Sequence, residues 1–167
     1  MIRALSAAEA RASVDALAEV LFDAVEGGAS VNFMAGYTRA EAAAYWLHIA
    51  DDVAAGGRVL LVAGEFDGTA QLILDMPPNQ AHRCDLAKML VHRRARRQGL
   101  GRALFQAACD EAVRRGRRLI VFDTVAGSGA ERLYLSCGAV KVGEIPDYAL
   151  MPDGAPAATS VFYKRLG

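Results

Sequence analysis

Apolar residues in the first third of the chain recur every three or four positions. This spacing runs over residues 14–25 and again over residues 42–53, and it places one apolar stripe along a helix. A Ser/Thr-x-x-Glu capping box precedes each segment, at Ser6 and at Thr38, and a Gly-Gly pair follows each. A capping box satisfies free backbone N–H groups at a helix start, and glycine commonly ends a helix. We therefore predict two helices, each lying between its capping box and its glycine pair.

The pattern then changes to the short apolar runs that are typical of strands. Residues 58–66 (RVLLVAGEF) and 69–76 (TAQLILDM) are joined by Asp67-Gly68, a strong signal for a two-residue hairpin. A further apolar run over residues 82–92 predicts another strand. The middle of the chain is thus expected to form an antiparallel hairpin followed by a third strand.

Helices and strands interleave in the rest of the chain. Apolar pairs at helical spacing predict a helix over 99–115, and an apolar run predicts a strand over 118–124. A short helix over 130–137 and strands over 140–145 and 159–166 complete the pattern. This order predicts a mixed sheet covered by helices.

Composition narrows the class of protein. The 167 residues are 53% hydrophobic and carry a formal net charge of zero, so we expect one folded domain over residues 1–167 and no global attraction to nucleic acid or to a membrane. The start of the chain lacks the apolar core of a signal peptide, and the three cysteines show no paired spacing. We therefore expect a cytoplasmic protein.

The most informative stretch is MLVHRRARRQGLGRAL, residues 89–104. It places a basic loop and the Gly-x-Gly of Gly99 to Gly101 between a predicted strand and a predicted helix. Glycines let backbone N–H groups approach an anion, and a helix N-terminus adds free donors and a positive dipole end. The stretch therefore predicts a pyrophosphate site. A mere turn beside solvated arginines is the alternative, and a dinucleotide-binding fingerprint fits poorly because the third glycine is missing.

These residues resemble a known family. Arg96-Arg-Gln-Gly-Leu-Gly101 matches the R/Q-x-x-G-x-G/A signature of the GNAT acetyltransferases, and AERLYLSCG, residues 130–138, is similar to the family's A-x-x-x-Y-x-x-x-G helix. The order of elements agrees along nearly the whole chain. Two further stretches, 76–104 and 145–154, resemble the branch that includes the tabtoxin-resistance acetyltransferase.

The resemblance implies an α/β (α+β) GNAT fold. Its central sheet would be mixed and largely antiparallel, with six to seven strands, about four flanking helices and a splay between strands four and five. It also implies acetyl-CoA as the co-substrate, with the pantetheine arm along the backbone of Met89, Leu90 and Val91. The residues implied for the pyrophosphate are Arg96, Arg97, Gln98, Gly99, Leu100, Gly101 and Arg102.

Three side chains are candidates for acid–base chemistry. Acetyl transfer requires a neutral amine, and a positioned base contributes roughly 10²–10⁴-fold. Asp85 and Asp123 lie on neighbouring strands of the family's sheet, where either is able to bind the acceptor's ammonium or to take its proton; each is alternatively only a polar strand end. Tyr134 occupies the family's usual general-acid position, where a phenol protonates the CoA thiolate, and its alternative is a tyrosine packed into the core.

Two loops shape the acceptor side in this family. In this sequence they supply Asn32, Phe33 and Tyr37, then Tyr148, and Asp123 faces the same region. Phe33 is alternatively a residue that folds under the loop into the core. Aromatics and acids suit a small zwitterionic amine. The resemblance thus implies an N-acetyltransferase acting on an amino-acid-like, antibiotic-like or toxin-like compound by direct attack in a ternary complex. A peptide or protein amine and a non-catalytic acetyl-CoA sensor stay open as alternatives, and a monomer and a homodimer fit equally.

Three other chemistries are not expected. The histidines at 48, 82 and 92 match no metal-ligand spacing. Cys84 and Cys137 suggest a route through an acetyl-cysteine, but a buried cysteine acting as a small hydrophobe is commoner. The arginine clusters are not interleaved with aromatics, and a cofactor's phosphates account for the first of them, so nucleic-acid binding is not expected.

Overall fold

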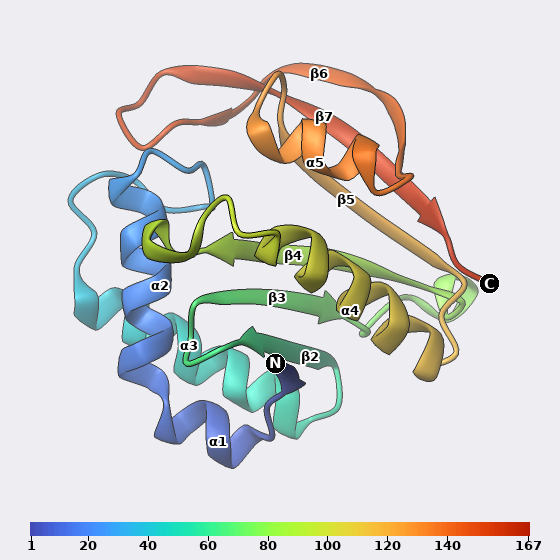
Figure 1. Cartoon of the computed structure of the whole chain (residues 1–167), viewed down its shortest axis with the longest axis horizontal. Helices are drawn as coiled ribbons and strands as arrows, with labels where there is room; N and C mark the ends of the chain where they lie inside the picture. The colour runs from blue at the N-terminus through green and yellow to red at the C-terminus, as the bar shows by residue number, and fades with distance from the viewer.

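The computed structural model describes all residues from 1 to 167, arranged as a twisted sheet with helices on both faces (Figure 1). The strands are β1 (Ile2–Ala4), β2 (Arg58–Ala63), β3 (Gly68–Ile73), β4 (Arg83–Val91), β5 (Leu119–Val125), β6 (Val140–Leu150) and β7 (Pro156–Arg165). The helices are α1 (Ala7–Ala12), α2 (Val14–Glu26), α3 (Arg39–Ala54), α4 (Leu100–Arg114) and α5 (Gly129–Ser136). Two short 3₁₀ turns, η1 (Pro78–Gln80) and η2 (Arg93–Ala95), flank β4.

The seven strands lie in the order β1-β2-β3-β4-β5-β7-β6. Every neighbouring pair is antiparallel except β4 and β5, which run parallel. The expected mixed, largely antiparallel sheet is therefore confirmed. No helix is long and apolar enough to span a bilayer.

The first predicted helix is divided in the structure. Both capping boxes form, at Ser6 and at Thr38, but Ser13 adopts φ −111° and ψ 17° and separates α1 from α2. Serine favours helix ends because its side chain competes for backbone hydrogen bonds. The break turns the chain so that Ala10 of α1 and Leu17 of α2 are both fully buried. The sheet also gains β1, whose three residues are too short to show a pattern.

Two hydrophobic clusters hold the layers together. One packs α4 and α5 against one sheet face, with Phe105, Phe122 and Phe162 among its largest members. The other packs α1, α2 and α3 against the opposite face of β2 and the end of β4, around Trp46. The helices thus cover the sheet from both sides, which fixes β4 between the two clusters.

A bulge in β4 creates the feature that matters most for function. Thr69 of β3 pairs with Leu90, but Gln71 pairs with Ala87, so β4 contains one extra residue. Lys88, in this bulge, has the left-handed φ of 46°. Because an extra residue reverses the alternation of side chains, Leu86 joins the cluster under α4 whereas Leu90 joins the cluster under α2 and α3.

The bulge also separates β4 from β5. These two strands pair only through Arg83, Cys84 and Asp85. Beyond them β5 continues along β7 alone as far as Val125, and one edge of β4 has no strand partner. This opening is the expected splay between the fourth and fifth strands.

Candidate active site

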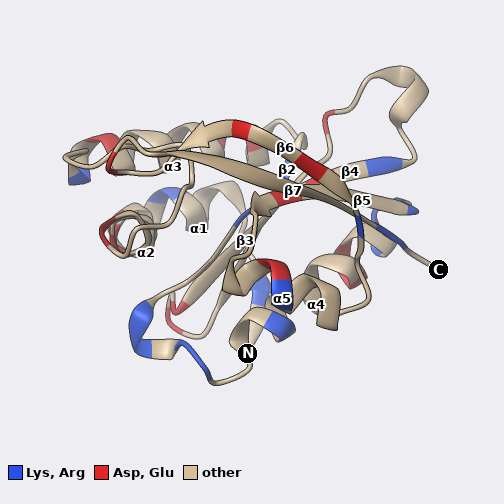
Figure 2. Cartoon of the chain, turned by 90° about the horizontal axis from the view of Figure 1, so that it is seen from above, with Lys and Arg blue, Asp and Glu red and all other residues tan.

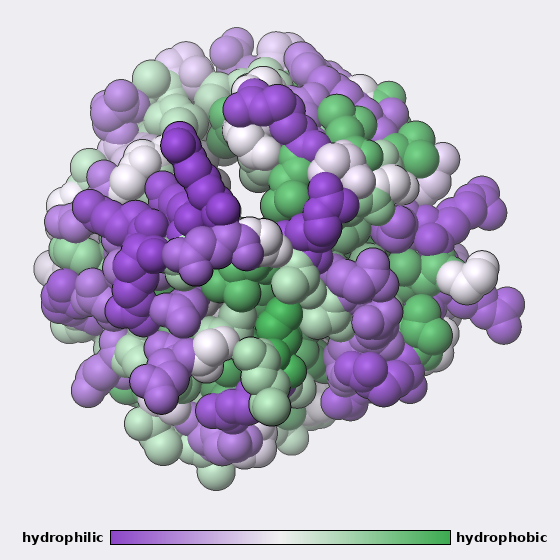
Figure 3. Space-filling model, in the orientation of Figure 1, coloured by the Kyte–Doolittle hydropathy of each residue, from purple (hydrophilic) through white to green (hydrophobic).

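A cavity of about 520 Å³ lies where β4 and β5 part. Its walls come from five segments: the α2–α3 loop, the bulged half of β4, the end of β5, the start of α5 and the β6–β7 hairpin. Figure 3 shows the molecule hollowed here, with hydrophilic residues gathered over α2 and the basic loop on one side of the opening. The volume is within the range of small-molecule sites.

The start of α4 provides an anion site at one side of the split. Gly99 caps the helix with φ 78°, and no side chain takes part in the cap. The first hydrogen bond of the helix runs from the Ala103 N–H to the Gly99 carbonyl, so the N–H groups of residues 100–102 have no partner within the helix. A Cβ on Gly99 would meet no atom within 4 Å. The approach to these donors is open, as a phosphate requires.

Figure 2 shows basic residues gathered in the loop before α4, and the contacts of these arginines divide them into two kinds. Arg93 and Arg94 fix the loop to the rest of the protein through Asp23 and Asp67. The Arg96 Nε donates to the Val91 carbonyl at 3.1 Å. Arg97, with φ 61°, makes no hydrogen bond or ion pair. The loop is thus held in place by some of its cations while Arg97 is left for a ligand.

Asp23 of α2 is the anchor of this loop, and the sequence analysis did not identify it. Asp23 is only 3% exposed. Its carboxylate accepts hydrogen bonds from the Arg93 N–H at 2.9 Å and from the Arg93 guanidinium. Burial alone would raise the pKa of Asp23, but the hydrogen bonds from Arg93 outweigh it and lower the pKa. An ionised Asp23 therefore ties α2 to the loop at neutral pH.

The side chains of two residues of the predicted phosphate loop bind other parts of the protein. Arg102 donates to the Ser136 carbonyl at 3.2 Å and to its hydroxyl at 3.0 Å, so its guanidinium joins α4 to the end of α5. Gln98 donates to the Arg94 carbonyl at 3.3 Å. Their side chains brace the loop, and only their backbone groups are left for the predicted phosphate contacts.

The unpaired edge of β4 faces the cavity. Met89 and Leu90 line it, whereas Val91 lies just outside, packed on the cluster under α4. Gly68 of β3 allows this arrangement, because a Cβ there would stand 2.7 Å from the Leu90 carbonyl oxygen. Free backbone groups along β4 are suited to an extended ligand that carries amides of its own.

Asp123 and Tyr134 lie on the opposite wall. The Thr159 hydroxyl is 2.6 Å from Asp123 Oδ2, and Asp123 forms no ion pair. The Tyr134 ring packs among Phe105, Phe122 and Phe162, while its hydroxyl has no protein partner. Burial raises the pKa of Tyr134, and the charge of Asp123 raises it further. A protonated phenol and a carboxylate therefore share the cavity.

Asp85 is not brought together with these groups. It pairs with Val121 where β4 and β5 are still joined, and its carboxylate forms an ion pair with Arg83. It does not line the cavity. Asp123, two residues beyond Val121, reaches the point where the strands part and lines the cavity.

The residues predicted to contact the acceptor lie in two different places. Asn32 and Tyr148 line the cavity. Phe33 and Tyr37 instead fold onto the cluster under α3, with ring centroids 4.9 Å apart. The Tyr37 hydroxyl is buried without a hydrogen-bond partner, and burial raises its pKa to about 12. Neither ring faces the cavity, because the apolar loop adds area to the core.

Comparison with known proteins agrees with this geometry. The Acetyltransferase (GNAT) family matches residues 15–139. The chain belongs to the GNAT acetyltransferase family.

Solved structures resemble the GNAT chain over nearly its full length. yncA from Salmonella typhimurium, assigned as an acetyltransferase and solved with its cofactor acetyl-CoA, is 21% identical with a TM-score of 0.80, covering 100% of this chain and 94% of its own. A ribosomal-protein-alanine N-acetyltransferase from Brucella melitensis is 23% identical with a TM-score of 0.80 and 99% coverage of both chains. A protein assigned as a phosphinothricin N-acetyltransferase is 16% identical with a TM-score of 0.78, covering 100% and 98%.

This GNAT protein is an N-acetyltransferase that uses acetyl-CoA. The residues present fit that co-substrate: the open N-terminus of α4 and the free Arg97 suit the pyrophosphate, and the unpaired edge of β4 suits the amides of the pantetheine arm. No group of three or more His, Cys, Asp or Glu side chains is arranged to hold a metal ion.

The GNAT cavity contains one charged residue that the sequence analysis missed. Lys88 lines it from the bulge of β4. The available signal was a single lysine within the otherwise apolar run from Leu86 to Val91. Burial, with a smaller effect of Arg58, lowers the pKa of Lys88 to about 8, although Asp123 opposes this shift.

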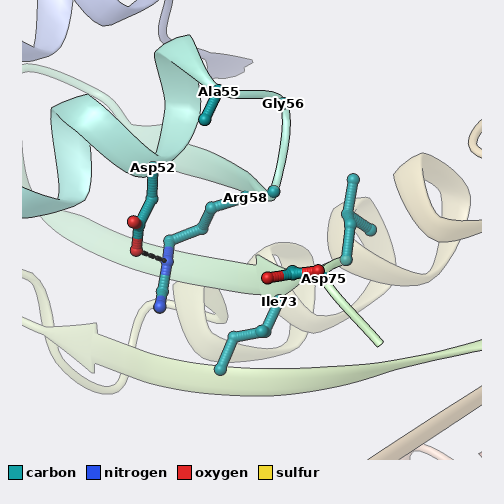
Figure 4. A pocket seen from close by; sticks show the side chains of 8 residues that line it. Asp52, Ala55, Gly56, Arg58, Ile73 and Asp75 are labelled. Atoms are coloured by element: carbon teal, nitrogen blue, oxygen red, sulfur yellow. Dashed lines mark hydrogen bonds and ion pairs between the residues drawn. The ribbon is translucent and has the colours of Figure 1, made fainter. Parts of the chain in front are cut away.

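A second cavity of about 460 Å³ lies at the end of α3 and shares no lining residue with the first (Figure 4). Arg58 and Asp52 form an ion pair there, with Nε and Oδ2 3.0 Å apart. The cysteines contribute to neither cavity.

Proposed function

We propose that this N-acetyltransferase acts on the amine of a small, amino-acid-like compound, such as an antibiotic or a toxin, by direct attack in a ternary complex. One observation carries the proposal: a single cavity joins the unpaired edge of β4 with Asp123 and Tyr134. Acetyl donor and acceptor amine would therefore meet in one cavity.

The closure of the acceptor side supports a small acceptor. The Ser30 hydroxyl donates to the Leu150 carbonyl at 3.0 Å, and the Ala35 N–H donates to the Pro152 carbonyl at 2.9 Å. These bonds join the α2–α3 loop to the β6–β7 hairpin. A small molecule fits below such a rim more readily than a polypeptide running across it.

Two side chains provide the proton chemistry in this proposal. Acetyl-CoA supplies the acetyl group as a thioester. Asp123 binds the acceptor's amine and takes its proton as the new N–C bond forms. Tyr134 gives its phenolic proton to the sulfur as the C–S bond breaks, and its raised pKa keeps that proton in place beforehand. The Thr159 hydroxyl orients the Asp123 carboxylate.

A route through an acetyl-cysteine has little support. Cys84 is fully buried in the cluster under α4, and burial raises the pKa of its thiol to about 12. Because the thiolate is the nucleophile, such a thiol is inert at neutral pH. Cys137 lies at the end of α5 but does not line the cavity.

Two relatives suggest different acceptors. The phosphinothricin N-acetyltransferase assignment agrees with an amino-acid-like compound, as does the resemblance to the tabtoxin-resistance branch. The ribosomal-protein-alanine N-acetyltransferase suggests a peptide amine as the second candidate. The closed rim argues for the first. The free thiols of all three cysteines suit a reducing cytoplasm.

The deciding experiment measures CoA thiol released from acetyl-CoA with small amines, amino-acid-like toxins and peptides as acceptors. Turnover with the amino-acid-like class and none with peptides is expected. Turnover confined to peptides would overturn the proposed acceptor class. Acetyl-CoA binding, measured by calorimetry, verifies that the protein is folded and competent in either case.

A further inference from the structure

Lys88 is a half-buried cation without a counter-ion. It lines the cavity from the bulge of β4, and its ammonium makes no hydrogen bond and no ion pair. The Lys88 ammonium faces the ring of Tyr45, whose centroid is 5.8 Å from Nζ. An unpaired buried charge is costly for a protein, so its presence beside the predicted reaction centre requires an explanation.

The neighbouring polar groups do not neutralise Lys88. Arg58 bonds Asp52 at 3.0 Å and Gln71 Oε1 at 2.7 Å. The Gln71 amide in turn donates to the Tyr45 hydroxyl at 3.1 Å. Asp52 thus neutralises the charge of Arg58. No carboxylate in this chain of hydrogen bonds neutralises the charge of Lys88. Arg58 instead adds positive potential, as its effect on the pKa of Lys88 shows.

Asp123 carries the opposite charge in the same cavity. The two residues come from β4 and β5, on either side of the split, and they interact electrostatically without forming an ion pair. Asp123 has one neutral partner, the Thr159 hydroxyl. The cavity therefore presents an anion and a cation that are held apart, which is the charge arrangement complementary to a zwitterion.

We propose that Lys88 binds a carboxylate, or a similar anionic group, of the acceptor while Asp123 binds its amine, so that the substrate class is that of α-amino acids and their close analogues. This inference rests on the proposed function and specifies its acceptor. Tyr45, whose ring centroid lies 5.8 Å from Lys88 Nζ, would act as a positioning residue behind the ammonium.

The test compares matched acceptors that differ only at the carboxylate. L-Phenylalanine is paired with L-phenylalaninamide and phenethylamine, and L-leucine with L-leucinamide and 3-methylbutylamine. Values of kcat and KM are measured at pH 7 with saturating acetyl-CoA for the wild type, for Lys88→Met and for Arg165→Met. Arg165 is an exposed cation without an ion pair at the end of β7, so its variant controls for loss of one positive charge.

Lys88→Met is expected to lower kcat/KM for the amino acids by about 10–100-fold, mainly through KM, because a hydrogen bond to a charged group contributes about 1.5–3 kcal/mol. The amides and the simple amines should change less than about threefold, since they make no such bond. Because each acceptor is compared with itself across variants, the different basicity of the amines cancels. Any left-handed backbone strain at residue 88 is shared by lysine and methionine, so it cancels as well.

Three outcomes separate the two ideas. An equal fall of kcat for amino acids and amides would assign Lys88 to proton transfer and overturn the inference, with the proposed function intact. Turnover of amides without any preference for amino acids would do the same. If no acceptor reacts, the proposed function fails, and binding of N-acetyl-L-phenylalanine with CoA is then measured by calorimetry. Binding that Lys88→Met abolishes would support the anion site, and no binding to the wild type would overturn it.

Discussion

The part of the cavity predicted for the cofactor and the part predicted for the acceptor differ in what they offer a ligand. The cofactor side presents mainly backbone: the free N–H groups at the start of α4 and the unpaired edge of β4. Its side chains, such as Arg93 and Arg102, mostly brace the loop. The acceptor side presents side chains, among them Asp123, Lys88 and Tyr148, which come from separate strands.

This difference separates the two kinds of specificity. A backbone site tolerates many side-chain replacements because the donors remain, but it depends on the segments that hold it in shape. A side-chain site responds to single replacements and is free to vary between relatives that keep one cofactor. We therefore expect substitutions to act on one side with little effect on the other.

The largest effect is expected from Asp123→Asn, which should lower kcat/KM by about 10²–10⁴-fold if the carboxylate takes the acceptor's proton. The amide oxygen still accepts from Thr159, so the acetyl-CoA Kd and the Tm should stay unchanged. Asp85→Asn provides the comparison, because Asp85 was the other predicted base and lies outside the cavity. A larger loss of turnover in Asp85→Asn would reverse our assignment.

Asp23→Asn should weaken acetyl-CoA binding indirectly, because Asp23 anchors the basic loop without contacting the cofactor itself. Losing charge-assisted bonds to Arg93 costs about 1.5–3 kcal/mol each, so we expect lower stability and an acetyl-CoA Kd raised by about tenfold. The lowered pKa of Asp23 stabilises the fold above the ordinary value of 3.8, and this contribution is lost as pH falls through the folded-state pKa. Calorimetric titration with acetyl-CoA checks the Kd, and urea unfolding at pH 7 and pH 3 checks the stability and its pH dependence.

The matched control for that experiment is Asp67→Asn, which releases Arg94 from the same loop. Its ion pair of 2.8 Å is much more exposed than that of Asp23, so a smaller loss is expected. Equal losses in the two variants would show that α2 has no special part in holding the loop.

The burial of Lys88 should appear as a stability that depends on pH. Its pKa is about 8 in the folded protein against an ordinary value of 10.5, so the unfolded chain binds more protons between these values and stability rises with pH there. Lys88→Met should be more stable than the wild type at pH 7, by roughly 1–3 kcal/mol. The difference should shrink to near zero by about pH 10.5. A constant difference would contradict the lowered pKa.

The smallest effect is expected from Arg97→Gln, which removes an exposed loop cation without a hydrogen bond or ion pair to the protein. Because exposed charges are screened, the acetyl-CoA Kd should rise only about two- to fivefold, and less in high salt. The KM of the acceptor should not change. Titrations at two salt concentrations, with Arg165→Gln as the control, test this expectation; a change in acceptor KM would break the proposed separation of the two sides.

Local signals predicted most of the fold. The capping boxes at Ser6 and Thr38 and the glycines before α4 each act on residues a few positions away, so the sequence shows them directly. The hairpin was predicted with a two-residue Asp67-Gly68 turn, but its loop consists of residues 64–67, because Gly68 already pairs with Ala63 as the first residue of β3. The family resemblance supplied the sheet and its splay, which are confirmed. The break at Ser13 was missed because a serine inside a helical pattern is neutral until tertiary packing rewards the bend.

The acceptor side was harder to predict because it depends on tertiary contacts. Phe33 and Tyr37 were expected at the acceptor, but rings from Phe22 and Tyr45 draw them into the core. Lys88 was missed because the simple alternation of β4 fails at the bulge, and no local pattern marks the extra residue. Asp123 was predicted as a candidate, yet only the register with Asp85 distinguishes the two carboxylates.

The short pairing of β4 with β5 also has a mechanical meaning. Three residue pairs join β4 to β5, and side chains from both halves of the sheet, β1–β4 and β5–β7, also share the cluster under α4. A ligand that spans the opening acts as a brace between the halves and stabilises the folded state by mass action, by about 2.7 kcal/mol at a concentration of one hundred times Kd. Acetyl-CoA is therefore expected to stabilise the fold as well as to donate the acetyl group. Amide exchange in the facing segments of β4 and β5 should slow when it binds.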